Sequence, residues 1–136
     1  MANWVTTIYK IDGDEEQVQK VYERIKETMS MVKPLVVSDF GVQWIGCLVE
    51  AFGESYQKVY CRGRVVEYGL SCGVLTVMVD IAESMFCDEL LDFFRRQAPG
   101  CEVYYLTDDA CGTRYSNDKD WKYFSVLYPK ESVRIV

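Results

Sequence analysis

The sequence predicts one α+β domain in which two long amphipathic helices cover the same face of a four-stranded antiparallel sheet. The chain has 136 residues, the usual size of a single domain, and we expect residues 1–136 to share one core. Two stretches repeat apolar residues every three or four positions, as helices do. Four other stretches are short and rich in β-branched and aromatic residues, as strands are. Their order along the chain predicts the architecture.

The first strand and the first helix are expected at the N-terminus. Residues 4–11 are β-branched and aromatic, and Asp12-Gly13-Asp14 ends that strand. Asp14 is followed three residues later by Gln17, the spacing of a capping box, so the helix is expected to begin there and to end before Pro34. Its apolar face consists of Val18, Val21, Tyr22, Ile25, Met29 and Val32.

A short helix and a hairpin are expected next. Residues 41–52 carry an apolar stripe, and Gly53 is a natural helix stop. Residues 58–62 alternate apolar and polar and predict a strand that bends at Gly63 and continues to Tyr68. After a turn at 71–73, residues 74–81 form the most strongly predicted strand.

A third helix, another strand and a terminal hairpin complete the prediction. Ser84 can cap the helix and Pro99-Gly100 ends it, and residues 101–107 follow as a core strand. Two short strands at 114–116 and 122–127 predict a C-terminal hairpin extension at about 113–128. The order β-α-(α)-β-β-α-β is that of the ferredoxin-like split βαβ sandwich, with the short helix inserted. Right-handed crossovers place both long helices on one face.

Composition restricts the functional classes. The net charge is −6, and an acidic surface repels phosphate backbones, so a nucleic-acid partner is disfavoured unless a basic patch exists. The chain begins without a basic and apolar leader and has no apolar run of about 18 residues, so we expect a cytoplasmic protein without a membrane partner. Histidine is absent, which removes Ser-His-Asp and Cys-His catalysis and most zinc sites.

The cysteines predict neither a redox motif nor a zinc site. There are 6 of them, and none stands in a CxxC pair. Cys47, Cys61, Cys87 and Cys101 lie among apolar residues and are interpreted as small buried hydrophobes. Cys111, in a polar turn, is the cysteine that we expect to be exposed. No cofactor is expected.

An acidic cluster and a basic strand are candidate binding sites. Carboxylates could hold Mg²⁺ or Ca²⁺, but the spacing of the acidic residues fits no calcium loop, and turns favour Asp for backbone reasons. The basic strand matches no complete RNA-recognition motif, because Arg64, Val65 and Val66 follow Arg62-Gly63 in place of the expected aromatic residue and glycine. The acidic cluster is Asp108, Asp109, Asp118 and Asp120, and the basic strand carries Lys58, Tyr60, Arg62, Arg64 and Tyr68.

The sheet face without helices is the third candidate. Alternation places Thr76 and Met78 on that face, where Tyr60 and Tyr104 are expected to join them. A face bearing Tyr and Met suits protein contacts or self-association. The alternative is that the terminal hairpin, with Trp121, folds over the face and covers it.

Short motifs occur along nearly the whole chain. They are Asn3-Trp4 with Gly13-Asp14, Asp39-Phe40-Gly41 with Trp44-Ile45-Gly46, Tyr60-Cys61-Arg62-Gly63, and Asp108-Asp109, Gly112, Asn117-Asp118 and Tyr123-Phe124. Together they resemble a family that phages, plasmids and conjugative elements of bacteria carry, which has an Api-like ferredoxin-like domain. The resemblance implies a ferredoxin-like fold and no established activity, so it assigns no catalytic residues. Members carry a Thr-Ala-Trp block after the third strand, where this chain has Ile81-Ala82-Glu83.

The leading hypothesis is a non-enzymatic interaction module, linked to mobile elements, that binds another protein or itself through the sheet. The second is a nucleic-acid-associated module that uses the Lys58–Arg64 strand. The third is a carboxylate- or metal-dependent enzyme. The residues predicted to bind a partner are Lys58, Tyr60, Arg62, Arg64, Met78 and Tyr104.

Overall fold

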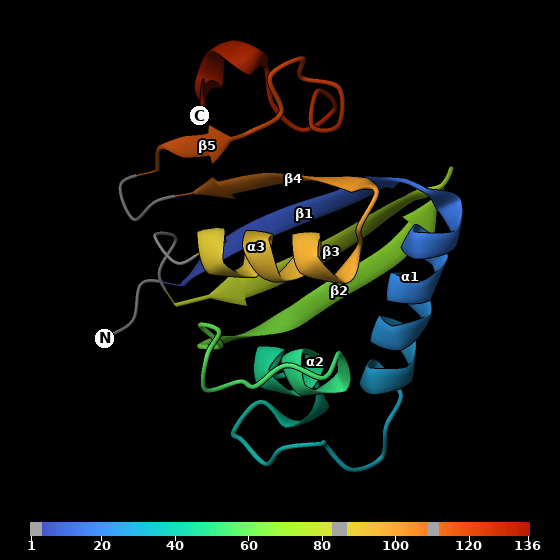
Figure 1. The fold of residues 1–136 in the computed structure, drawn as a ribbon. Helices are drawn as coiled ribbons and strands as arrows, with labels where there is room; N and C mark the ends of the chain where they lie inside the picture. Colours follow the sequence, from blue (N-terminus) through green and yellow to red (C-terminus); the bar gives the residue numbers. More distant parts are fainter. Residues whose placement is uncertain (1–3, 83–86, 109–111) are drawn as a thin grey trace.

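The chain folds into three α-helices and one open mixed sheet, which the computed structural model describes for residues 4–82, 87–108 and 112–136 (Figure 1). The sheet has six strands in the order β2-β3-β1-β4-β5-β6, not the four that the sequence predicts. Neighbours are antiparallel except β5 and β6, which are parallel. The strands are β1 (Val5–Gly13), β2 (Gly63–Ser71), β3 (Val74–Ile81), β4 (Cys101–Asp108), β5 (Arg114–Ser116) and β6 (Val133–Ile135).

The helices are α1 (Glu15–Met29), α2 (Ile45–Ala51) and α3 (Cys87–Gln97), and two short 3-10 helices span Gly41–Gln43 and Lys130–Ser132. As predicted, Asp14 caps α1, its carboxylate accepting the N–H of Glu16 at 3.3 Å. The helix predicted for 41–52 is divided, because Trp44 adopts an extended backbone between the 3-10 turn and α2. Within the described residues, no helix is long and apolar enough to cross a membrane. Ser84 lies outside the described residues.

The main core lies between the three helices and one face of the sheet. Every second residue of β3 is buried there, and the Tyr9 and Phe94 rings meet at 5.0 Å between centroids. The expectation that both long helices share one face is therefore confirmed, and α2 lies beside β2 at the edge of the sheet (Figure 1). The helices contribute Val18, Val21, Ile25, Ile45, Leu48, Val49, Leu90, Phe93 and Phe94 to this core.

The hairpin of β2 and β3 differs from the prediction at its start. Residues 58–62 are not a strand, and two of their polar backbone groups bond to side chains instead of to a ladder. The N–H of Tyr60 donates to Glu89 at 2.6 Å, and the indole N–H of Trp44 donates to the carbonyl of Cys61 at 2.7 Å. β2 begins only at Gly63, and the bulge falls between Val65 and Glu67 rather than at Gly63.

The C-terminal hairpin predicted for about 113–128 does not form. Residues 114–116 are β5, but 122–127 are not a strand, and the partner of β5 is the parallel strand β6 from the tail. The intervening segment turns because the carboxylate of Asp118 accepts the N–H groups of Lys122 at 3.1 Å and Tyr123 at 2.8 Å. It builds a second core on the opposite face of the sheet, from Leu106, Trp121, Phe124 and Val133, with Ile8 and Tyr104 against it.

Candidate docking edge of the sheet

The sheet face without helices is covered on its β4 side by the C-terminal segment. Tyr104 stacks on Tyr123 with ring centroids 4.3 Å apart and planes at 24°. The Tyr123 hydroxyl donates to Asp12 at 2.6 Å, and burial raises the pKa of Tyr123. Tyr104, predicted as a binding residue, is therefore half-buried under this segment.

The β3 and β2 side of the same face stays open. Met78 and Thr76 of β3 point to it, as predicted, and both are half-buried. The ammonium group of Lys10, on the neighbouring strand β1, donates to the Thr76 hydroxyl at 2.7 Å, and burial lowers the pKa of Lys10. Asp80 accepts a bond from Thr6 at 2.8 Å. On this half of the face, the polar groups of Lys10, Thr76 and Asp80 are hydrogen-bonded, and Met78 is partly exposed.

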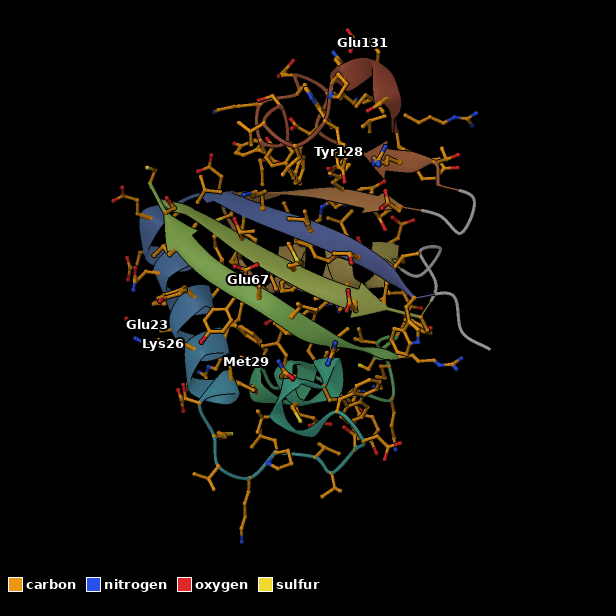
Figure 2. All side chains as sticks on the ribbon, turned by 180° about the vertical axis from the view of Figure 1, so that it is seen from behind. Glu23, Lys26, Met29, Glu67, Tyr128 and Glu131 are labelled. Carbon is orange, nitrogen blue, oxygen red and sulfur yellow. The ribbon has the colours of Figure 1, made fainter. Side chains whose placement is uncertain are left out.

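A cleft of about 300 Å³ opens on this half of the face, over the C-terminal part of β2. Gly69 lines it, and a Cβ at this position would meet no heavy atom within 4 Å. Figure 2 views the sheet from this side, with Glu67 on the half that lies away from Tyr128 and the C-terminal segment. The cleft is lined by Glu67, Tyr68, Gly69, Leu70, Ser71, Thr76 and Met78.

β2 is an outer strand of the sheet. Among the residues that the structure describes, only Arg64, near the start of β2, pairs outward, through an isolated antiparallel bridge to Trp44. Beyond that bridge, no strand among the described residues pairs with the outer side of residues 66–71. We call this outer side, together with Thr76 and Met78 of the cleft, the β2 edge. Glu67 is exposed there and has no ion-pair partner within the described part of the chain.

The basic and aromatic residues predicted to form one strand are not brought together on one face. Lys58 and Arg62 are exposed in the irregular segment before β2, which also holds Tyr60. Arg64 lies 3.9 Å from the carboxylate of Asp80. Tyr68 points to the helix side, where its ring lies 6.2 Å from that of Tyr22 on α1. The bulge in β2 causes this separation, because one extra residue reverses which side chains face outward.

Two residues of the predicted acidic cluster, Asp118 and Asp108, make contacts within the fold. Asp118 is 1% exposed, and both of its oxygens accept backbone N–H groups. Asp108 pairs with Arg114 at 3.4 Å, and Asp120 is exposed. Asp109 lies outside the described residues. Over the ranges that the structure describes, no group of three or more His, Cys, Asp or Glu side chains could hold a metal ion.

Cys47 and Cys61 are buried, and Cys101 is half-buried, as free thiols. Burial raises the pKa of Cys61 to about 12, which keeps it protonated and unreactive at neutral pH. Cys72, in the turn between β2 and β3, is exposed, which the sequence did not lead us to expect. Cys111 lies outside the described residues, and nothing is described for the side chain of Cys87.

Of the six residues that the sequence predicted to bind a partner, only Met78 lines the cleft. The signal that sequence reasoning missed is Gly69, because a glycine inside a strand often marks the close approach of another chain. Where the family block was expected, Ile81 and Ala82 are buried at the end of β3, and Glu83 lies outside the described residues. Comparison of the chain with models of protein families, with curated proteins and with solved structures found no match.

Proposed function

We propose that this protein is a non-enzymatic interaction module that binds an extended segment of a partner protein at the β2 edge. The observation that carries the proposal is that residues 67–71 pair with β3 on one side and, in the described part of the chain, with no strand on the other. An outer strand presents unpaired N–H and C=O groups, and a partner strand can continue the ladder through them. The open cleft beside this edge offers a place for one of the partner's side chains.

The same proposal includes a finer description of the fold. The four strands in the order β2-β3-β1-β4, all antiparallel, support a ferredoxin-like split βαβ unit to which β5 and β6 are added. Such a unit agrees with the resemblance to the family carried by mobile elements. A cytoplasmic site of action and a link to mobile elements are parts of the proposal that rest on the sequence.

A partner protein is favoured over a second copy of the chain. The open stretch of β2 carries one charged side chain, Glu67, and no basic one, so two copies paired at this edge would form no ion pair between these strands. Each copy also carries a net charge of −6, which opposes association. A partner segment that carries positive charge avoids both costs.

The experiment is selection of peptides from a random library displayed on phage, with the purified protein as the target. Peptides that bind at the proposed place shift the amide NMR signals of residues 67–71, Thr76 and Met78, and slow the hydrogen exchange of the outward N–H groups of β2. The control target is Gly69→Pro, which removes one N–H group and distorts the strand. Selected peptides whose signals map to the C-terminal segment, or that bind the Pro variant equally well, would contradict the proposal.

The nucleic-acid alternative stands second. It needs a continuous basic face, whereas Arg64 lies beside Asp80 and Tyr68 faces the helices. A gel shift with single-stranded RNA at low salt tests it, and a salt-sensitive shift that Lys58→Ala and Arg62→Ala remove together would favour this alternative.

A further inference from the structure

We infer that the β2 edge selects partner segments that read aromatic, apolar, basic from N- to C-terminus. The three residues would lie opposite Gly69, Tyr68 and Glu67, in that order, in an antiparallel strand added to β2. The inference rests on the proposed function and names the chemistry of the partner. Three independent features of these positions carry it.

The first feature is the hollow over Gly69. Residues directly opposite each other in an antiparallel pair point to the same face, so the residue opposite Gly69 projects over the cleft of about 300 Å³. Gly69 pairs with Thr76 on its other side, so Thr76 and Met78 form the inner wall. An aromatic ring that lies across a glycine shields its backbone, and a methionine sulfur beside the ring adds a favourable contact.

The second feature is the carboxylate of Glu67. It lies on the same face as Gly69, two residues away, and pairs with Met78 across the β2–β3 ladder. Glu67 is exposed without an ion-pair partner in the described residues, so a lysine or arginine opposite it gains a cross-strand ion pair. A glutamate at that position would face Glu67 at the same distance and be repelled. The net charge of −6 also attracts a basic segment over a longer range.

The third feature is Tyr68, which lies between these two positions and points to the helix side. Its ring is half-buried against Tyr22 and the main core. The partner residue opposite Tyr68 would point to the same helix side, next to this ring, where an apolar side chain suits it.

The chain itself carries this pattern at Tyr60-Cys61-Arg62 and, inside α3, at Phe93-Phe94-Arg95, whose two rings are buried, but a second copy can offer neither segment. Cys61 is buried, and its carbonyl accepts the indole N–H of Trp44 at 2.7 Å. The N–H of Tyr60 is bonded to Glu89. Both hydrogen bonds would have to break, and the segment would have to unfold from the second copy, before it could pair with β2. The segment that binds at the β2 edge therefore belongs to another protein.

The test uses four synthetic fluorescent five-residue peptides, a length that stays within the open stretch 66–71. Each has threonine at both ends and Phe-Val-Lys, Phe-Val-Glu, Ala-Val-Lys or Thr-Val-Thr at the centre. Fluorescence anisotropy gives their dissociation constants. We expect the Phe-Val-Lys peptide to bind about two- to fivefold more tightly than each peptide that lacks one feature. The variant Glu67→Lys is expected to reverse the preference between Lys and Glu. Glu131→Lys, which makes the same change in charge at the far end of the molecule, should leave it unchanged (Figure 2).

The variant Gly69→Val, which fills the hollow, is expected to abolish the preference for Phe over Ala. Circular dichroism checks that each variant is folded. If all four peptides shift the NMR signals of β2 with equal affinity, the proposed function stands and the inference about its partner is wrong. If no peptide, including Thr-Val-Thr, reaches the β2 edge at millimolar concentration, both are wrong.

Discussion

Replacement of Asn117 by alanine is expected to loosen the C-terminal segment from the sheet. The side-chain amide of Asn117 takes the place of a strand neighbour beside β4. Its Oδ1 accepts the N–H of Tyr105 at 2.8 Å, and its Nδ2 donates to the carbonyl of Val103 at 3.0 Å. Tyr105 and Val103 are buried, so their backbone groups have little access to water once the amide is removed.

The expected cost follows from these two bonds. Each contributes about 1 kcal/mol net, and a buried group left unpaired costs about 1–3 kcal/mol. Asn117 is itself half-buried, so water can partly replace the lost amide. We therefore expect Asn117→Ala to lower the free energy of unfolding by about 2 kcal/mol.

Urea unfolding followed by circular dichroism measures this free energy, and NMR hydrogen exchange measures the protection of the Tyr105 amide. Asn117→Asp is the matched variant, because it keeps an acceptor for Tyr105 but loses the donor to Val103. It should protect the Tyr105 amide better than Asn117→Ala does. The exposed Gln43→Ala serves as the control. A loss below about 0.5 kcal/mol for Asn117→Ala, with the Tyr105 amide still protected, would refute this reasoning.

Three further predictions follow from other contacts. Leu106→Ala removes a 3% exposed side chain from the second core and is expected to cost about 2–5 kcal/mol in urea unfolding; a loss under about 1 kcal/mol would mean that this core is not packed. Gly63→Ala should be clearly destabilising, because its Cβ would lie 2.1 Å from the Asp80 carbonyl, whereas Gly69→Ala meets nothing within 4 Å and should be tolerated; equal melting temperatures would contradict the contact. The Arg96 guanidinium lowers the pKa of Glu54 from its ordinary value of 4.5. A depressed pKa in the folded state adds stability at neutral pH, and this stability is lost as the pH falls through the depressed pKa. Arg96→Gln should therefore lower the free energy of unfolding by about 0.5 kcal/mol at pH 7 and by less below pH 4.5. A loss that does not change with pH would show that the ion pair does not contribute.

The elements that sequence reasoning placed correctly are those with a local signal. The alternation in 74–81 and the three- and four-residue repeat from Val18 to Ile25 follow from which side chains are buried, and burial leaves the same period in the sequence. Val32, which the predicted repeat also included, lies beyond the end of α1 and is exposed. The segments 58–62 and 122–127 also look like strands but are not. A strand requires a neighbour for its backbone groups, and here side chains such as Glu89 and Asp118 bind those groups instead.

The candidate site was harder to predict for the same reason. Met78 was placed on the open face by alternation alone, and it lines the cleft. Tyr104 was expected beside it but is stacked under Tyr123, which comes from a segment with no strand signal. Arg64 and Tyr68 were assigned to one basic strand, and the bulge after Val65 turns them to opposite faces. A bulge of one residue leaves no composition signal that separates it from a regular strand.

The sequence by itself determined the mixed class of the fold, the long helices and the strands of the central sheet, because period and capping are local properties. Only the tertiary structure decided which strands lie at the margins of the sheet. The C-terminal segment covers the β4 side and adds two strands there, so the sheet ends at β6 on that side and at β2 on the other. That outcome depends on hydrogen bonds and packing between residues far apart in the chain, which no window of the sequence contains.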